Sequence, residues 1–465
     1  MIGRMRRGLQ LAVLVATAAI ATAAPARAAL PPIKHVFIVT LENEDADTSF
    51  GPGTKAVYLS QTLRAKGAFV PGYFATGHLS LDNYISLVSG QGPNPVTQAD
   101  APAYTDFLPG AAGPNGQAIG QGSVYPTSVQ TIADQLDAKG RSWRGYMEDM
   151  GNSATEAKTC RHPANGSPDG TQTARQGDQY AARHNPFVYF HSIIDDQARC
   201  DAKVVPLDRL TGDLTSVSTT PNYAFISPNL CHDGHDTPCK GSNEPGGLVS
   251  ADGFLKQWIP KILASPGYAD GGLVMVIFDE AATHDASACC GEVQGPNTAN
   301  NGATTQGAGG GRVGAVLLSQ YIRPGTLSKV EYNHYSLLRS VEDMFGVSHL
   351  GYAGADGLKA FGDDIFTNPA GNVLPPVAGP KVKIAGVPSQ CVRRRFRVHV
   401  TATGSGVGLV VKLDKRQVRS TRKAKLAFWV SASHAAPGAH RLRAMATDRF
   451  GRVASRSAKF SRCTA

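Results

Sequence analysis

Two pairs of oxygen-bearing side chains stand directly after the two most apolar segments of this chain. Glu42 and Asn43 follow the run VFIVTL, and Asp279 and Glu280 follow the run LVMVIF. Both runs have the length and composition of strands that are buried on both faces of a parallel sheet. Ligands of open α/β sheets bind outside the carboxyl ends of the strands, and carboxylate and amide oxygens suit a divalent cation. The two pairs together predict a metal site at one sheet edge, whereas either pair alone would be read as an ordinary polar loop.

A serine that could act as a nucleophile lies between these pairs in the sequence. Ser80 ends the polar turn GHLS, and a helix is predicted to follow from Asn83 to Val88. A metal ion beside a hydroxyl lowers its pKa and generates a nucleophile. Asn83, three residues further on, could donate a hydrogen bond to a developing oxyanion. Taken alone, Ser80 would be interpreted as the N-cap of the helix.

Histidines supply candidate acids and phosphate contacts. The segment PNLCHDGHD follows another apolar run and contains Asn229, His232, Asp233, His235 and Asp236. His334 stands at the predicted start of a helix, where backbone N–H groups favour an anion such as phosphate. A single histidine, such as His191 or His284, is more often a surface or hydrogen-bonded residue than a ligand.

The elements that must position these residues alternate between strand and helix up to about residue 365, which predicts an α/β layer fold. A helix is expected over 128–138, with Thr127 and Gln130 as a capping box. Strands are expected over 142–148 and 313–319, and a second helix is expected to stop at Gly346. These bounds are read from the apolar spacing of the sequence.

The chain has 465 residues, which predicts two domains. Residues 1–28 have the pattern of a signal peptide, with a basic start, a short apolar run and a small-residue cleavage site. The catalytic domain is predicted over 29–367, a Pro/Gly linker over 368–380 and a small β-sandwich over 381–465. We therefore expect the protein to be exported, and then either released into the medium or associated with the cell wall.

Eight cysteines in an exported chain predict disulfides. Cys391 is expected to pair with Cys463, because they bracket the last domain, and Cys231 with Cys239, because this pair would close a short loop. Adjacent Cys289 and Cys290 are expected to bond elsewhere rather than to each other. No repeated CxxC spacing supports a thiolate metal site.

The net charge of +10 is unevenly divided. Residues from Lys381 onward contain 20 Lys and Arg but two acids, Asp414 and Asp448, which gives this part +18; the remainder has 26 basic and 34 acidic residues. This balance predicts contact with an anionic wall polymer or membrane surface, and the alternative is a solubilising surface. This basic part of the chain contains few aromatic residues, so we do not expect it to recognise nucleic acids specifically.

Seven stretches in a fixed order resemble the bacterial secreted phosphoesterase family of the alkaline-phosphatase superfamily. They are HVFIVTLEN, GHLSLDNYISLVSGQ, SWRGYMEDM, RHNPFVYF, PNLCHDGHD, VIFDE and YNHYSLLRSVEDMFG, and they cover most of residues 35–350. That family includes acid phosphatases, phosphatidylinositol-3-phosphatase-like enzymes and phospholipases C. The resemblance implies an alkaline-phosphatase-like layered sheet with helices on both faces. The last segment is similar to bacterial Ig-like modules through a GxHxLxxxAxDxxG pattern.

The resemblance also implies roles for single residues. The implied metal ligands are Glu42, Asn43, Asp279 and Glu280; the metal is divalent, and its identity and number stay open. Ser80 matches the phosphoryl-accepting nucleophile and Asn83 the phosphate-contacting amide. His78 and His184 are expected near the substrate, and His235 or His334 is expected to protonate the leaving group.

Two departures from the family pattern favour the acid-phosphatase branch. Residues 44–50 replace the Ser-Phe-Asp type of segment that phospholipases C usually carry, and Ala281-Ala282 replaces Gly-Gly. The predicted function is hydrolysis of phosphomonoesters, phosphoinositides among them, through a phosphoserine. The alternatives are a phospholipase C that acts on a phospholipid and a non-catalytic wall-binding protein.

Overall fold

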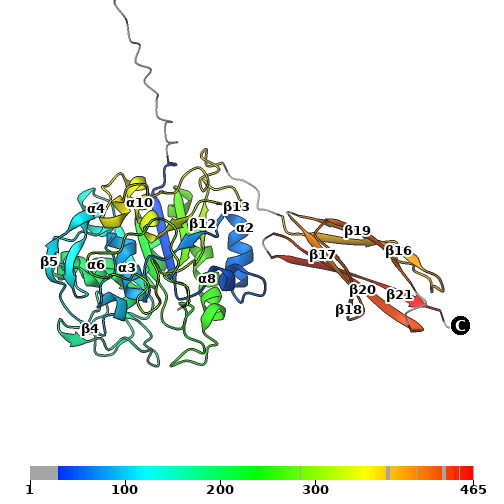
Figure 1. Ribbon diagram of the computed structural model, residues 1–465, viewed down its shortest axis with the longest axis horizontal. Helices are drawn as coiled ribbons and strands as arrows, with labels where there is room; N and C mark the ends of the chain where they lie inside the picture. The colour runs from blue at the N-terminus through cyan, green and yellow to red at the C-terminus, as the bar shows by residue number, and fades with distance from the viewer. Residues whose placement is uncertain are drawn as a thin grey trace, which may run out of the picture.

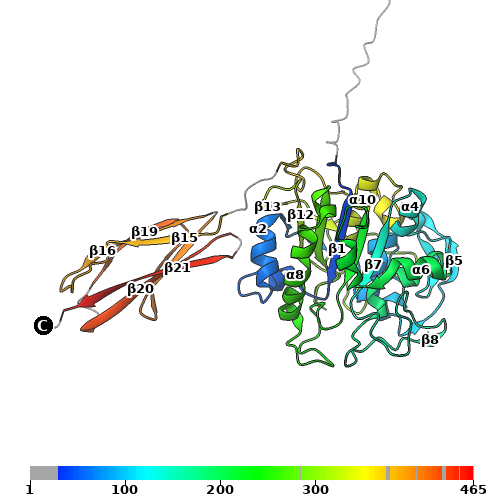
Figure 2. The same cartoon turned by 180° about the vertical axis from the view of Figure 1, so that it is seen from behind.

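The computed structural model describes residues 30–282, 284–372, 378–404, 406–431, 436–449 and 451–463. The predicted signal peptide and the middle of the predicted linker lie outside these residues. Figures 1 and 2 show a mixed α/β body up to residue 372 and an all-β part from residue 378. No helix among the described residues is both long and apolar enough to cross a membrane.

The α/β body is built on an eight-stranded sheet. In sheet order its strands are β13 (Thr326–Leu327), β2 (Ala68–Val70), β12 (Ala315–Ser319), β11 (Gly272–Phe278), β1 (His35–Leu41), β10 (Tyr223–Ser227), β7 (Trp143–Met147) and β9 (Val204–Pro206). The five strands from β11 to β9 are parallel, whereas β12 runs antiparallel to β11 and to β2. The α/β expectation is confirmed, and the sheet is mixed.

The register of the two central strands decides where the site forms. β1 and β11 are parallel neighbours, and Leu41 lies opposite Phe278. Every residue of both strands is buried, so both faces of the sheet centre are covered. The ladder continues for one step, because the Asp279 N–H donates to the Leu41 carbonyl at 2.8 Å. The polar residues that follow the two strands therefore emerge side by side.

Helices form two groups around the sheet. In the first, α3 (Ser80–Ser89), α4 (Ile132–Ala138) and α10 (His334–Phe345) pack together; in the second, α8 (Gly247–Leu263) packs with the π-helix η1 (Tyr58–Leu63), which leads into α2 (Arg64–Lys66). The other helices are α1 (Ala46–Phe50), α5 (His191–Ile194), α6 (Gln197–Lys203), α7 (Arg209–Asp213), α9 (Pro266–Ala269), and the 3₁₀ turns η2 (Thr97–Ala99), η3 (Pro114–Gly116), η4 (Ala182–His184), η5 (Pro186–Tyr189) and η6 (Gly351–Gly354).

The expected start of the helix over 128–138 is wrong. The helix begins at Ile132, and Thr131 is its N-cap, with Asp134 completing the capping box. The preceding residues form a turn in which the Val129 N–H donates to the Pro126 carbonyl at 2.9 Å. The Asp134 carboxylate, at the third helical position, accepts the backbone N–H of Thr131. This hydrogen bond favours a helix that starts after Thr131 rather than at Ser128. The stop at Gly346 is confirmed, because this residue ends α10 in the left-handed region.

Short ladders tie the long loops to the body. β3 (Tyr73–Phe74) pairs with β14 (Tyr332–Asn333), β4 (Ala103–Tyr104) with β8 (Ser167–Pro168), and β5 (Leu108–Ala112) with β6 (Ala118–Gln121). The disulfides Cys231–Cys239 and Cys391–Cys463 form as expected, and Cys160 pairs with Cys200.

The expectation for the adjacent cysteines is wrong. Cys289 and Cys290 bond to each other. The six other cysteines form three pairs among themselves, so neither of these two has another sulfur to bond. Spacing along the sequence could not show this, because it depends on which cysteines the fold brings together.

The C-terminal part is a two-sheet β-sandwich. One sheet contains β15 (Lys381–Ala385), β16 (Phe396–Thr403) and β19 (Lys425–Val430). The other contains β18 (Arg416–Thr421), β17 (Gly408–Leu413), β20 (Gly438–Thr447) and β21 (Val453–Arg462). Alternate residues of both sheets enclose a separate hydrophobic core that includes Val398, Val411 and Leu442. The sandwich is confirmed, and its Ig-like character stays a prediction.

Candidate active site

Four side chains with oxygen atoms converge where β1 and β11 end. One terminal atom of the Asn43 amide lies 3.1 Å from Asp279 Oδ1 and 3.2 Å from both Glu42 Oε2 and Glu280 Oε1. All three carboxylates are at most 3% exposed. Burial raises the pKa of each of them, and the Glu42 and Glu280 charges raise that of Asp279 further. Buried carboxylates that share one site either take up a proton or are stabilised by a positive charge.

The residues present fit a divalent cation. The donor set consists of oxygen atoms, the buried Asp279 Oδ2 has no hydrogen-bond partner, and Asn43 holds a left-handed backbone with φ of 52°. A non-glycine residue in this region stores strain, which persists where function requires it. An alternative arrangement turns the Asn43 amide so that its NH₂ group donates to the three carboxylates; this satisfies hydrogen bonds but leaves the carboxylate charges unneutralised.

Ser80 points at this cluster. It is the first residue of α3, and the preceding Leu79 has φ of 75°, a second strained position beside the same cluster. The Ser80 hydroxyl donates to Glu42 Oε2 at 2.7 Å. One helical turn later, the Tyr84 hydroxyl donates to Glu42 Oε1 at 2.5 Å. Spacing of four residues puts both groups on one face of the helix, so α3 holds both oxygens of Glu42.

The Asn83 side chain is occupied by the turn before Ser80. Its carbonyl oxygen accepts the N–H groups of Thr76 and Gly77, both at 3.1 Å. Its NH₂ group donates to the carbonyls of Gly77 at 2.7 Å and Leu79 at 3.1 Å. Asn83 therefore holds the shape of the turn. The structure does not present its amide to the cluster, in contrast to the phosphate contact that the sequence predicted.

His78 lies beside Glu280. Its Nδ1 contacts Glu280 Oε2 directly, and its Nε2 lies 2.8 Å from the Asp285 carbonyl. Burial acts to lower the pKa of His78, but the Glu280 carboxylate outweighs it and raises the pKa above its ordinary value. The Leu79 N–H donates to the same Glu280 oxygen at 2.8 Å. Both ring nitrogens of His78 are thus engaged: Nδ1 orients the Glu280 carboxylate, and Nε2 ties the ring to the Asp285 carbonyl.

Two predicted histidines lie behind the carboxylates. The His184 Nε2 is 3.5 Å from Glu42 Oε2, and its ring stacks on Tyr84 with centroids 5.2 Å apart. The His334 Nε2 lies 2.6 Å from the Asp279 carbonyl, and its Nδ1 lies 3.0 Å from the Tyr73 hydroxyl. Burial lowers the pKa of both, that of His334 to about 4. They are neutral supports of the site and do not line its cavity.

A cavity of about 170 Å³ opens in front of the cluster. It is lined by Glu42, Asn43, His78, Leu79, Ser80, Asp100, Arg183, His235, Glu280, Thr304 and Thr305. The His235 side chain is 52% exposed and lies at this cavity, as the predicted proton donor should. Five lining residues were missed by the sequence analysis: Leu79, Asp100, Arg183, Thr304 and Thr305.

Arg183 is the single Lys or Arg among the lining residues. Its side chain is 11% exposed, its Nε lies 3.7 Å from Asp100 Oδ2, and one terminal nitrogen donates to the Gln172 carbonyl at 3.3 Å. Asp100 in turn accepts the Leu81 N–H at 2.9 Å near the start of α3. Arg183 precedes His184 in the RHNPF stretch, and this adjacency was the signal that could have identified it.

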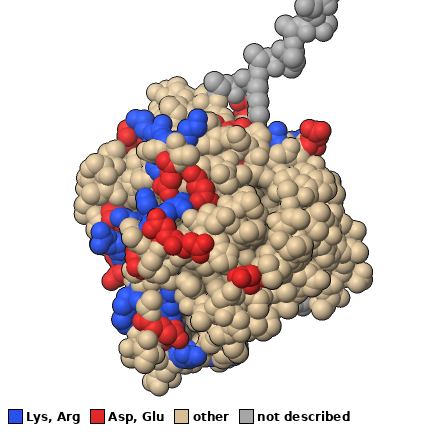
Figure 3. Space-filling view, turned by 90° about the vertical axis from the view of Figure 1, so that its left-hand side faces the viewer, with Lys and Arg blue, Asp and Glu red and all other residues tan. Residues whose placement is uncertain are grey.

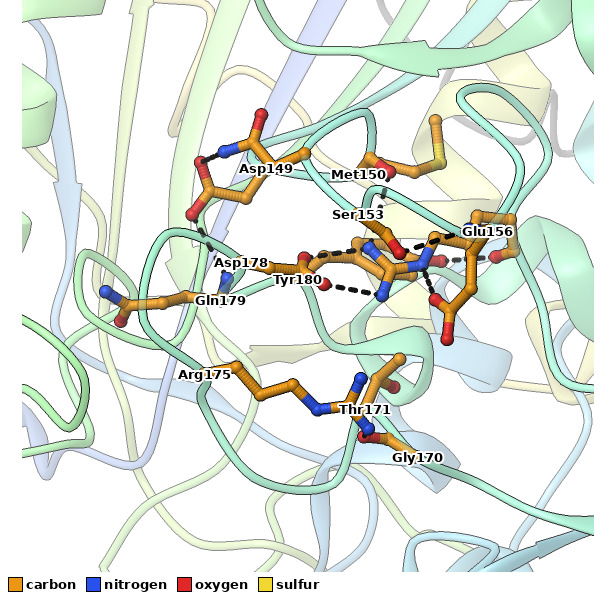
Figure 4. A network of polar contacts seen from close by, with 12 residues as sticks. Asp149, Met150, Ser153, Glu156, Gly170, Thr171, Arg175, Asp178, Gln179 and Tyr180 are labelled. Carbon is orange, nitrogen blue, oxygen red and sulfur yellow. Dashed lines mark hydrogen bonds and ion pairs between the residues drawn. The ribbon is translucent and has the colours of Figure 1, made fainter.

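A polar network connects the loops between residues 149 and 180 (Figure 4). Arg161 donates to both carboxylate oxygens of Asp178 at 2.8 Å and lies over the Tyr180 ring. Asp149 accepts the Gln179 N–H at 3.2 Å and the Asn229 NH₂ group at 2.8 Å. The Asn229 segment also reaches β1, because the Glu42 N–H donates to the Asp233 carbonyl at 2.9 Å. The network therefore fixes the loop that carries His235.

Two other groups of potential metal ligands occur among the described residues. They are Cys231, His232 and Glu244, and Cys289, Cys290 and Glu292. The cysteines of both groups are bonded in disulfides, so they cannot supply thiolates. The cluster at the ends of β1 and β11 instead offers oxygen donors alone.

Comparison with known proteins gives related phosphatases. The phosphate-repressible acid phosphatase of Penicillium chrysogenum is 28% identical over 70% of this chain and 62% of its own length. A probable acid phosphatase of Kluyveromyces lactis is 25% identical over 68% and 59%. The phosphatidylinositol-3-phosphatase of Mycobacterium tuberculosis is 24% identical over 70% and 82%. The chain thus spans about 60% of the length of the two fungal relatives.

The pattern that defines the Phosphoesterase family matches residues 53–348. This match covers more than half of the chain, and it includes Ser80, Arg183, His235 and both acids after β11. The match agrees with the resemblance seen in the sequence. The chain belongs to the Phosphoesterase family.

Proposed function

We propose that this protein is a metal-dependent phosphomonoesterase of the acid-phosphatase type, with an alkaline-phosphatase-like catalytic domain. One observation carries the proposal: the Ser80 hydroxyl lies 2.7 Å from Glu42 Oε2, beside four oxygen donors, in a cavity that also holds Arg183. The named relatives are acid phosphatases and a phosphatidylinositol-3-phosphatase. Phosphomonoesters are the substrate class that these names share.

Glu42, Asn43, Asp279 and Glu280 would hold the divalent cation. When bound, the cation would lower the pKa of the Ser80 hydroxyl and neutralise charge on the substrate phosphate. The protein's own contribution is to keep the ligands in place. Tyr84 holds Glu42, and His78 and the Leu79 N–H hold Glu280.

The reaction proceeds in two displacements. Ser80 Oγ gives its proton to Glu42, attacks phosphorus and forms a phosphoserine, while the ester P–O bond breaks. His235 donates a proton to the departing alkoxide, which leaves as the alcohol. Water then gives a proton to His235 and attacks the phosphoserine; the P–Oγ bond breaks to release phosphate, and Glu42 returns its proton to Ser80 Oγ. Arg183 binds the non-bridging phosphoryl oxygens and stabilises the negative charge that they carry.

Release of inorganic phosphate distinguishes a phosphomonoesterase from the alternative activity, that of a phospholipase C. Purified protein, loaded with a divalent metal, should release inorganic phosphate from p-nitrophenyl phosphate and phosphatidylinositol 3-phosphate. A phospholipase C would instead release phosphocholine from phosphatidylcholine, and a wall-binding protein would release neither. Ser80→Ala should lose phosphate release and the acid-stable phosphoserine. Full activity in Ser80→Ala would exclude the mechanism.

We also propose that the protein is secreted, since residues 1–28 have a signal-peptide pattern and all the cysteines are paired in disulfides. N-terminal sequencing of protein collected from the culture medium should begin at Ala29. A protein retained in the cells with its first residue intact would contradict this.

A further inference from the structure

The outer face of the three-stranded sheet in the sandwich is a distinct surface. Strand β16 alternates strictly between buried and exposed residues, with Val398 and Val400 in the core and Arg397 and His399 outside. The same alternation in β15 and β19 defines the outer face. We call the following residues the basic face: Lys381, Lys383, Arg397, His399, Lys425 and Trp429.

The strand register arranges the basic face in rows. Lys383 lies opposite Thr401, which lies opposite Lys425, so one row has a cation on each edge strand. A second row pairs Arg397 with Trp429. Trp429 is 53% exposed, and the Arg395 guanidinium lies 4.9 Å from its ring centroid. In the first row, the small residue Thr401 separates Lys383 from Lys425.

The charge on this face has no acid near it. The only acids from residue 381 to the end of the chain are Asp414 and Asp448. Asp414 contacts His440 Nδ1 and the Arg441 N–H, both at 2.9 Å, and Asp448 accepts from Arg452 at 2.8 Å. Both acids are therefore engaged away from the basic face. On the large domain, Figure 3 shows Lys and Arg side by side with Asp and Glu.

We propose that the basic face docks on a bilayer that contains anionic phospholipids. The exposed side of a sheet can lie against a planar partner, and each Lys or Arg near an anionic bilayer surface contributes favourably. An exposed tryptophan is amphipathic and places its ring at the headgroup level. The inference does not depend on the catalytic assignment, because it concerns only the C-terminal sandwich.

A linear acidic polysaccharide is the competing occupant, and an adjoining cavity would bind it. The sandwich has a cavity of about 850 Å³ next to β18 and β19, lined among others by Arg416, Arg419 and Trp429, so the cavity shares Trp429 with the basic face but none of the basic face's lysines. A polysaccharide chain would contact this cavity, whereas a bilayer would contact the exposed outer face. Variants of the two surfaces therefore separate the two occupants.

The test is co-sedimentation of the full-length protein with vesicles. Vesicles of phosphatidylcholine mixed with phosphatidylserine should bind the protein at low salt, and vesicles of phosphatidylcholine alone should not. Lys383→Ala/Lys425→Ala should weaken binding by about tenfold or more, since one cation contributes about fivefold. The matched control, Arg443→Ala/Lys459→Ala, removes the same charge from exposed positions on the other sheet and should change binding far less.

Tryptophan fluorescence gives a second readout. Trp143 and Trp258 are at most 6% exposed, so quenching by brominated lipids reports on Trp429. Quenching is expected with the anionic vesicles and should disappear in Trp429→Phe. Equal loss of binding in both double variants, or absence of quenching, would overturn the proposal. So would failure to bind vesicles together with binding to dextran sulfate that Arg416→Ala/Arg419→Ala abolishes.

Discussion

Tyr84 and Glu42 are joined by a 2.5 Å hydrogen bond between the tyrosine hydroxyl and carboxylate Oε1. The other oxygen of the same carboxylate accepts from Ser80 at 2.7 Å. Glu42 thus links the strand-end cluster to Ser80, the proposed nucleophile, and Tyr84 fixes the carboxylate orientation that makes this link. Tyr84 is fully buried and stacks on His184, so it has no room to move away.

Removing the Tyr84 hydroxyl should reduce catalysis without unfolding the protein. Tyr84→Phe keeps the ring stacked on His184 but removes a hydrogen bond to a charged group, which contributes about 1.5–3 kcal/mol. We expect kcat/KM for p-nitrophenyl phosphate to fall by about 10- to 100-fold. Tyr223→Phe is the matched control, because its buried hydroxyl has no hydrogen-bond partner. Equal activity of the two variants would show that Tyr84 does not position Glu42.

Metal removal should have a thermodynamic signature besides loss of activity. Without a cation, the buried Glu42, Asp279 and Glu280 carboxylates repel one another, so a chelator should lower Tm as well as activity. Asp279→Asn removes one charge. This variant should be more stable than the wild type in chelator and less stable than the wild type with metal.

The control for the metal experiment is Glu342→Gln. Glu342 is a buried carboxyl whose pKa burial raises to about 9, so a neutral amide replaces a group that is already neutral at pH 7. Its Tm should respond to chelator as the wild type does. If Asp279→Asn also shows the same response as the wild type, the strand-end cluster is not the metal site.

Arg183 should act on phosphate binding. Arg183→Ala should raise KM and weaken inhibition by inorganic phosphate, since a hydrogen bond to a charged group contributes about 1.5–3 kcal/mol. Arg183→Lys should recover part of the affinity, because lysine supplies the charge but lacks the planar fork. Arg175→Ala, at an exposed site on a neighbouring loop, should behave as the wild type. An unchanged phosphate inhibition constant in Arg183→Ala would contradict the assigned role.

The raised pKa of His232 should make the free energy of unfolding depend on pH. Burial acts to lower its pKa, but Glu148 and Glu244 outweigh burial and raise the pKa to about 9. Because the unfolded value is about 6.5, the charged histidine stabilises the fold fully below pH 6.5, and this contribution is lost as pH rises through about 9. Its size is about 1–2 kcal/mol, since Glu244 is largely exposed.

Urea unfolding of wild type and His232→Gln measures this effect. The wild type should be the more stable protein near neutral pH, and the difference should shrink as pH rises past about 9. A difference that stays constant over this range would mean that the histidine charge does not stabilise the fold.

The position of the two polar pairs at the strand ends could be predicted from the sequence because strand periodicity and burial are local. A short run rich in β-branched residues such as VFIVTL favours a buried strand, and parallel strands end at one edge, so Glu42 and Asp279 were expected to meet before their register was known. The helix stop at Gly346 was also local, because glycine readily takes the left-handed conformation.

Roles that depend on contacts across the fold needed the tertiary structure. Asn83 and His334 have the right chemistry for phosphate, yet Asn83 is occupied by its own turn and His334 by the Asp279 carbonyl. Arg183 looked unremarkable in the chain, and only the path of the loop through η4 brings it to the cavity. The bond between Cys289 and Cys290 depended on which other cysteines the fold had paired.

The sequence by itself determined that this chain would place Glu42, Asn43, Asp279 and Glu280 at the edge of an α/β sheet, with Ser80 as the hydroxyl. Residue type and period carry that information, because burial acts on each strand separately. The tertiary structure decided that Ser80 contacts Glu42, that Tyr84 holds the same carboxylate and that Arg183 faces them. The two hydrogen bonds to Glu42 join residues 38 and 42 positions apart, and only the packed fold fixes such distances.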